Sequence, residues 1–166
     1  MGDRRGDGKD ALFFQEHGLQ VTCVDLSPET VKLCRQKGLD AHMMDVADLQ
    51  FPAESFDAVY TLNCLLHIPK NELPVVLRAI HAILKPAGLF YMGVYGGYDH
   101  EGVWDQDPYT PQRFFSFYTD EHLQQVTGAV FDTLSFKRIP LDEQAHLHFQ
   151  SLTLMRKEIE GEGKAA

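Results

Sequence analysis

Three polar side chains, Asp25, Asp45 and Asn63, each come directly after a short apolar run in this 166-residue chain. Parallel strands bring their carboxyl ends to one edge of a sheet, where an acid can accept hydrogen bonds from the hydroxyl groups of a ribose. Asp25 and Asp45 are the candidates for that chemistry. Each also fits a plainer role, since Asp25 could cap the helix that follows it and Asp45 could be an exposed acid at a strand end.

A glycine-containing segment, Gly6-Asp7-Gly8-Lys9-Asp10, precedes the apolar stretch 11–14. Such a segment is typical of a turn that leads into a helix and lets the backbone approach a ligand. Gly8 stands 17 residues before Asp25, close to the spacing of about 20 that separates a glycine turn from a ribose-binding acid. The same composition is also found in solvated N-terminal tails.

The elements that would position these residues alternate between strands and helices. Ser27 is the expected N-cap of a helix that Gly38 ends. A second helix follows the periodic apolar positions from 71 to 84 and is ended by the segment 86–88, and a third opens at 119–121. The predicted strands are 20–24, 40–44, 57–62, 89–95, 131–139 and 146–155.

This alternation favours an α/β fold, with a mainly parallel sheet, helices on both faces and an antiparallel hairpin at the C-terminal end. A chain of 166 residues with 44% hydrophobic content suits one buried core. We therefore expect a single domain over residues 1–157 and a frayed tail over 158–166.

Several segments resemble those of the class I, Rossmann-like, S-adenosylmethionine-dependent methyltransferases, and the resemblance covers nearly the whole chain. Residues 24–28 (VDLSP) are similar to the family's ribose-binding segment, and 44–49 (MDVADL) to the segment that holds adenine. Residues 56–59 (FDAV) and 65–69 (LLHIP) look like the fourth strand and its loop. Residues 84–90 (LKPAGLF) look like the turn before the fifth strand.

The resemblance implies the strand order 3-2-1-4-5-7-6, S-adenosylmethionine as cofactor, and methyl transfer to a small-molecule acceptor that the sequence does not identify. It places Asn63 and Cys64 beside the methionine part of the cofactor. The cofactor contacts that it implies are Gly6, Gly8, Asp25, Leu26, Asp45, Val46, Asn63 and Cys64.

An aromatic-rich segment, 104–118, holds six aromatic side chains in fifteen residues, at the point where the family builds its substrate cover. Aromatic faces could enclose a methyl-accepting centre and stabilise a sulfonium cation, and Arg113 could bind an anionic group. About half of these rings are expected to be core residues instead. The candidate substrate contacts are Tyr95, Trp104, Tyr109, Arg113 and Phe115.

His67 is the candidate catalytic base, because an imidazole titrates near neutral pH and this one follows the predicted fourth strand. A packing role explains it equally well, and an acceptor that is already nucleophilic needs alignment more than a base. His100, His146 and His148 have no carboxylate or thiol at ligand spacing, so no metal site is predicted.

Charge and composition narrow the class of partner. Fifteen basic and 24 acidic residues give a net charge of -9, which argues against nucleic acids and anionic membranes. No apolar run approaches the roughly 18 residues of a membrane-spanning helix. Three cysteines, odd in number and without a C-x-x-C pair, fit a reducing cytoplasm. The oligomeric state stays open.

The family's first strand, an apolar run before the glycine turn, has no counterpart here, because only Met1-Gly2-Asp3-Arg4-Arg5 stands at that point. We expect the sheet to lack this central strand and interpret the chain as N-terminally truncated. Two alternative functions stay open. One is a non-catalytic relative with weak or no cofactor binding. The other is a nicotinamide-dependent dehydrogenase, which would share the glycine turn and the ribose acid but not the segment 84–90.

The missing strand has a measurable consequence, because two blocks of sheet with nothing between them leave backbone donors and acceptors unpaired. We expect the 166-residue chain to aggregate, unfold partly or exchange strands. We also expect it to bind S-adenosylmethionine far more weakly than a version with an apolar strand added upstream. Thermal unfolding and cofactor titration of both versions measure this. A cooperative, monomeric chain of the present length with micromolar affinity would show that the strand was misplaced.

Overall fold

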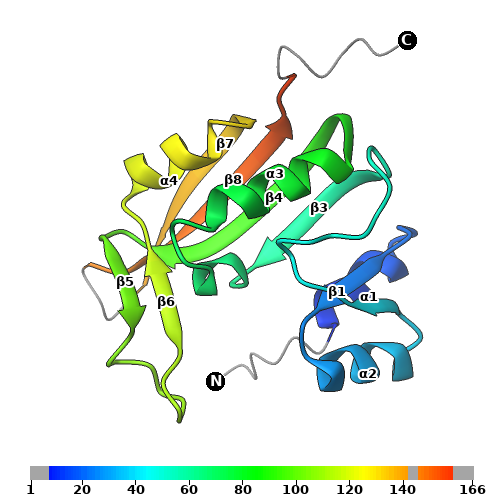
Figure 1. Ribbon diagram of the computed structural model, residues 1–166, viewed down its shortest axis with the longest axis horizontal. Helices are drawn as coiled ribbons and strands as arrows, with labels where there is room; N and C mark the ends of the chain where they lie inside the picture. The colour runs from blue at the N-terminus through cyan, green and yellow to red at the C-terminus, as the bar shows by residue number, and fades with distance from the viewer. Residues whose placement is uncertain (1–7, 142–145, 159–166) are drawn as a thin grey trace. The chain divides into compact units, whose positions relative to one another are not determined.

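The predicted alternation of strands and helices is present in the computed structural model, which describes residues 8–141 and 146–158 (Figure 1). The chain divides into two units, residues 1–50 and 51–166, and each is described by itself. Gly6, part of the predicted turn near 140–143 and nearly all of the predicted frayed tail lie outside the described residues. The prediction of a single domain stays a prediction. Within the described ranges, no helix is both long enough and apolar enough to cross a membrane.

The first unit pairs two short parallel strands, β1 (Thr22–Asp25) and β2 (Asp40–Met43), which are joined by α2 (Pro28–Gln36). Ser27 caps α2 as predicted, because its hydroxyl oxygen accepts a hydrogen bond from the Thr30 N–H at 3.2 Å. The cap satisfies one of the unpaired donors of the first helical turn. It also fixes where the chain leaves the carboxyl end of β1.

A preceding helix, α1 (Lys9–Glu16), begins at Gly8, whose φ of +76° is in the left-handed region. A Cβ atom at this position would lie 2.7 Å from Leu39 Cδ1, so glycine is needed both for its backbone angle and for space. The helix and β1 contribute partly buried side chains to the small core of this unit. That core consists of Val31, Cys34, Leu39 and Ala41, with Ala11, Leu12 and Cys23 packed against it.

The second unit is built on a four-stranded sheet in the order β3-β4-β8-β7. Strands β3 (Phe56–Leu62) and β4 (Leu84–Gly96) are parallel, and β8 (His148–Arg156) runs antiparallel to both β4 and β7 (Phe131–Pro140). This order corresponds to 4-5-7-6 of the expected family topology, while β1 and β2 correspond to strands 2 and 3. The expected Rossmann-like α/β fold with a C-terminal antiparallel hairpin is confirmed.

The expected first strand would lie between β1 and β3. Each of these strands has one neighbour, β2 for β1 and β4 for β3, and no strand of the described residues pairs with the second edge of either. The residues that would supply such a strand from the N-terminal end, 1–7, are outside the described ranges.

Two helices, α3 (Leu73–Ile83) and α4 (Asp120–Thr127), lie over the same face of the four-stranded sheet (Figure 1). The helix α4 opens within the predicted segment 119–121, and Thr119 caps it, since its hydroxyl oxygen accepts from the His122 N–H at 3.2 Å. The core between these layers is formed by side chains that are at most 1% exposed. They include Leu73, Val76, Leu77, Ile80, Phe90, Met92, Leu123, Phe131, Leu152 and Leu154.

The boundary between α3 and β4 differs from the prediction. The sequence pattern extends the helix to 84 and ends it at 86–88, but α3 ends at Ile83 and Leu84 already pairs with Phe56 of β3. The segment 86–88 lies in an irregular stretch of β4 in which Ala87 has a φ of +57°. Backbone pairing with β3 therefore decides the helix end.

The second unit also contains three short elements that the sequence did not predict, of which one, β6 (Phe114–Phe117), lies in the aromatic-rich segment. Strands β5 (His100–Val103) and β6 form an antiparallel pair. A short 3-10 helix, η1 (Leu65–His67), follows β3.

Packing of α3 on the sheet is the main source of stability that we expect in this unit. Leu77 is 1% exposed, so Leu77→Ala should lower the free energy of unfolding by about 2–5 kcal/mol through lost transfer energy and a cavity. Val75 lies on the same helix but is 47% exposed, so Val75→Ala should change it by about 0.5 kcal/mol or less. Urea unfolding measures both, and equal effects would contradict this packing.

Candidate functional site

Two carboxylates, those of Asp25 and Asp45, lie at the carboxyl ends of the neighbouring parallel strands of the first unit. The Met44 N–H donates to the Asp25 carbonyl oxygen at 3.3 Å, which ties the two strand ends together. Asp25 Oδ1 accepts from the Ser27 N–H at 2.7 Å, and Asp45 Oδ1 accepts from the Ala47 N–H at 2.8 Å. Each acid thus forms the same local turn, in which the backbone N–H of the residue two positions later donates to one carboxylate oxygen.

The other carboxylate oxygen of both acids remains for a ligand. Within the part of the chain that the structure describes, Oδ2 of Asp25 and Oδ2 of Asp45 have no hydrogen-bond partner. Leu26, beside the first acid, is 64% exposed, and Val46, beside the second, is half-buried. The sequence-predicted residues of this unit are therefore brought together at one edge of the small parallel sheet.

Asn63 directly follows β3 in the second unit and carries an unpaired buried acceptor. Its φ of +51° is a left-handed angle that asparagine tolerates better than most residues. Its N–H donates to the Gly93 carbonyl oxygen at 2.7 Å, while its side-chain Oδ1 is buried without a hydrogen-bond partner. Such an atom is costly unless a donor reaches it. Cys64, the next predicted residue, is exposed.

His67 is held by one nitrogen and is half-buried. Its Nδ1 lies 2.8 Å from the Phe114 carbonyl oxygen, and because a carbonyl can only accept, Nδ1 carries the proton. In the neutral ring Nε2 is then a lone-pair acceptor. Burial lowers the pKa of His67, outweighing the hydrogen bond to Phe114, and the positive charge of Arg113 lowers that pKa further. The ring is thus a neutral imidazole at neutral pH.

Four of the predicted substrate residues form a connected cluster, in which Phe115 packs against this histidine. The Phe115 ring centroid lies 4.7 Å from that of His67 and 5.3 Å from that of Trp104. The Arg113 guanidinium carbon lies 5.1 Å from the Phe115 ring centroid and 4.2 Å from the Tyr109 ring centroid. Phe115 is 5% exposed and Tyr109 is 47% exposed, so this cluster combines core rings with exposed ones, as expected.

Arg113 has an internal partner that the sequence analysis did not foresee. Its Nε and Nη2 atoms donate to the two carboxylate oxygens of Asp107, at 2.9 and 2.7 Å. The Asp107 side chain is fully buried. Such a two-pronged contact fixes the guanidinium plane over the rings. The predicted contact between Arg113 and an anionic group would therefore have to share this arginine with Asp107.

The fifth predicted substrate residue, Tyr95, belongs to β4 and not to the segment 104–118. It is half-buried in β4 and packs edge-on against Phe149 of β8, with ring centroids 5.6 Å apart. Sequence reasoning also missed the contact between Asp120 and His148, which are 28 residues apart. No local spacing signals such a pair, because Asp120 is in α4 and His148 is in β8, and only the folding of the chain brings the two together.

Comparison with known proteins gives matches in sequence and in fold. A family model described as a methyltransferase domain matches residues 5–92. A ubiquinone biosynthesis O-methyltransferase from Xanthomonas oryzae pv. oryzae is 38% identical over 82 residues, which cover 45% of this chain and 34% of that protein. The match thus spans about a third of the length of that relative.

Solved structures share the fold over most of the chain. The 1,6-didemethyltoxoflavin-N1-methyltransferase of Burkholderia thailandensis, with bound S-adenosylhomocysteine, is 27% identical with a TM-score of 0.74 and covers 92% of this chain and 68% of its own. An S-adenosylmethionine-dependent methyltransferase from Methanosarcina mazei is 20% identical with a TM-score of 0.77 and covers 91% and 88%. The second likeness shows the fold alone.

The ion pair beneath the aromatic cluster predicts a pH dependence of stability. The hydrogen bond from Arg113 lowers the pKa of Asp107 from 3.8 to about 2. Because the folded-state pKa is depressed, the pair stabilises fully above pH 3.8 and loses its effect as pH falls toward about 2. The stability difference between wild type and Asp107→Asn should shrink over that range in acid-titrated urea unfolding.

The exposed neighbour Asp105 supplies the control for this measurement. Asp105→Asn should follow the wild type at every pH. A difference between wild type and Asp107→Asn that stays constant from pH 5 to pH 2 would contradict the ion-pair account.

Proposed function

Because this chain belongs to the methyltransferase-domain family, we propose that it transfers a methyl group from S-adenosylmethionine to a hydroxyl oxygen of a small molecule. The family model matches residues 5–92, more than half of the chain. The resemblance to class I S-adenosylmethionine-dependent methyltransferases is thereby confirmed, and with it S-adenosylmethionine as the cofactor of the family. The acceptor and the activity of this chain are the proposed part.

The unpaired oxygens at the strand ends carry the proposal. Asp25 and Asp45 each keep one carboxylate oxygen without a partner while the backbone fixes the other. At Asp25, a carboxylate oriented in this way is suited to accept hydrogen bonds from the ribose hydroxyl groups. Asp45 and the N–H of Val46 would hold the adenine ring by the family resemblance. Gly8, at the start of α1, would let the backbone approach the cofactor.

Asn63 fits the methionine end of the cofactor. Its buried Oδ1 lacks a donor, and the ammonium group of the methionine moiety is a strong donor of the required kind. The orphaned acceptor therefore supports the assignment on grounds independent of the family resemblance. When bound, S-adenosylmethionine supplies a methyl group on a positively charged sulfur.

His67 supports a hydroxyl oxygen as the acceptor atom. A neutral imidazole with Nδ1 on the Phe114 carbonyl keeps Nε2 free to take a proton from a hydroxyl group. The ring of Phe115 beside it, and that of Trp104 packed on Phe115, suit a flat apolar molecule. The Xanthomonas relative is named as an O-methyltransferase, which is consistent with this choice. These residues would orient the acceptor, which is much of what methyl transfer requires.

The non-catalytic alternative has one observation in its favour. Within the described ranges, β1 and β3 each keep an unpaired edge where the family has a central strand. A chain without that strand could keep the fold of both units and lose tight cofactor binding. Cofactor affinity separates this alternative from the enzyme.

Calorimetric titration with S-adenosylmethionine tests the proposal. We expect S-adenosylmethionine to bind. Asp25→Ala should weaken this binding by roughly 2 kcal/mol or more, because a charged hydrogen-bond acceptor for two hydroxyl groups is lost. Glu16→Ala removes an exposed acid from the same unit, outside the segments assigned to the cofactor, and should leave the affinity unchanged. A parallel titration with NADH should show no binding. Binding of NADH in place of S-adenosylmethionine would reverse the assignment, and equal affinities of wild type and Asp25→Ala would remove Asp25 from the site.

A further inference from the structure

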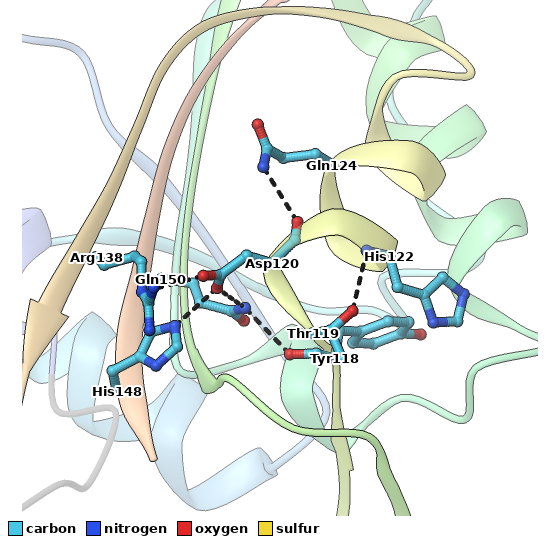
Figure 2. Close-up of polar contacts among 8 residues, drawn as sticks. All are labelled: Tyr118, Thr119, Asp120, His122, Gln124, Arg138, His148 and Gln150. Atoms are coloured by element: carbon cyan, nitrogen blue, oxygen red, sulfur yellow. Dashed lines mark hydrogen bonds and ion pairs between the residues drawn. The ribbon is translucent and has the colours of Figure 1, made fainter. Parts of the chain in front are cut away.

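A largely buried carboxylate joins the first turn of α4 to the four-stranded sheet (Figure 2). Asp120 Oδ1 lies 2.7 Å from His148 Nε2 and accepts from Gln150 Nε2 at 2.7 Å, and Asp120 Oδ2 lies 3.1 Å from Arg138 Nε. The Asp120 side chain is only 14% exposed. Because a carboxylate accepts, His148 Nε2 must carry a proton. Three donors from β7 and β8 therefore converge on one acid of α4.

These contacts are not those of a helix cap. Thr119 already caps α4 through its hydroxyl oxygen, and the carboxylate of Asp120 faces the strands instead. Glu121, the next residue, is exposed and can interact with the helix dipole without any such contact. Although burial by itself raises the pKa of Asp120, the hydrogen bonds from Gln150 and His148 hold that pKa below its usual range.

Gln150 extends the contact from Asp120 to the chain just after β6. It is fully buried, and its Nε2 also donates to the Tyr118 carbonyl oxygen at 3.1 Å, which the Gly97 N–H reaches at 2.9 Å. Both neighbours of Nε2 are acceptors, so the amide cannot be reversed, and Oε1 is left buried without a partner. Oε1 occupies the space that a Cβ atom at Gly96 would need.

The same strand, β6, carries the partner of His67 at its other end. Phe114, its first residue, provides the carbonyl oxygen that accepts from His67 Nδ1. Phe115 and Phe117 pack against Trp104, with ring centroids 5.3 and 5.4 Å apart. Tyr118 follows β6 directly. A displacement of the Tyr118 carbonyl would therefore move the whole strand and the ring environment of His67.

We propose that Asp120 is a positioning residue of the acceptor side, which through Gln150 and His148 holds the end of β6 on the sheet and thereby fixes His67 and the rings beside it. Asp120 itself does not contact the acceptor. The importance of this for catalysis rests on the proposed function, whereas the coupling between Asp120 and His67 is a property of the protein alone.

Asp120→Asn tests the coupling in the absence of a methyl acceptor. The asparagine amide turns an N–H group toward at least one of the three hydrogen-bond donors around it, so that donor loses its acceptor. Two readouts apply to the 166-residue chain. One is the His67 titration by NMR, assigned with His67→Gln. The other is the emission of Trp104, the only tryptophan. We expect the His67 pKa to rise toward the ordinary value of about 6.5 and the emission to move to longer wavelength.

Glu121→Gln is the matched control, since it removes the same charge from the same helical turn at an exposed position. It should leave both readouts at their wild-type values. If Asp120→Asn lowers the free energy of unfolding but gives the same His67 pKa and Trp104 emission as Glu121→Gln, Asp120 only attaches α4 to the sheet and the positioning role is wrong.

A second pair of variants decides the matter if Asp120→Asn does not fold. His148→Gln keeps a side-chain N–H for Asp120, and His148→Leu does not. We expect wild-type emission and an unchanged His67 pKa for His148→Gln, and the changes expected of Asp120→Asn for His148→Leu. Identical behaviour of the two variants would overturn the proposal.

Cofactor titration separates a failure here from a failure of the proposed function. Asp120→Asn should keep the wild-type affinity for S-adenosylmethionine, because the proposed cofactor contacts are elsewhere. If the wild type does not bind S-adenosylmethionine, the proposed function is contradicted, and the coupling between Asp120 and His67 is unaffected by that result.

Discussion

Strand β4 hydrogen-bonds to β3 on one side and to β8 on the other, and this double pairing determines where the groups of the acceptor side lie. The parallel register with β3 brings Leu62 opposite Gly93, and the antiparallel register with β8 brings His148 opposite Gly96. Three distant parts of the chain therefore reach one edge of the sheet. A shift of one residue in either register would turn every side chain of the neighbour to the opposite face.

The alternation of side chains along β4 and β8 then separates packing from polar function. Phe90 and Met92 of β4 face Leu154 and Leu152 of β8 under the two helices. Further along the same face, at the end where β4 finishes, Gln150 and His148 replace the apolar residues and meet α4. The polar cluster is buried but almost fully hydrogen-bonded, which is the condition under which buried charge is tolerated. Rigid support of this kind suits a site that acts mainly by orientation.

Local signals predicted much of the fold. The Ser27 cap and the start of α4 at 119–121 lie where the sequence placed them, because a helix start depends on residues within one helical turn. The end of α3 could not be predicted in the same way, since the apolar residues Ile83 and Leu84 suit both a helix and a strand. The pairing of Leu84 with Phe56, 28 residues away, decides between the two.

The residues of the candidate site likewise divide into those that local sequence features predict and those that they do not. The acids that follow β1 and β2 were foreseen because a strand end is a local feature, and their contacts with a cofactor stay predictions. The pairing of Arg113 with Asp107 and of Asp120 with His148 was not foreseen, because each depends on how the chain folds back on itself. Fold likeness adds the family but does not assign the acceptor. The assignment of function therefore depends on the atoms left without partners.

A crystal structure of the 166-residue chain with S-adenosylhomocysteine tests the central claim most directly. We predict that the ribose hydroxyls donate to the carboxylate of Asp25 and that the ammonium group of the ligand donates to Asn63 Oδ1. A ligand bound elsewhere, with the carboxylate of Asp25 and the amide oxygen of Asn63 both still lacking a donor from it, would contradict the account.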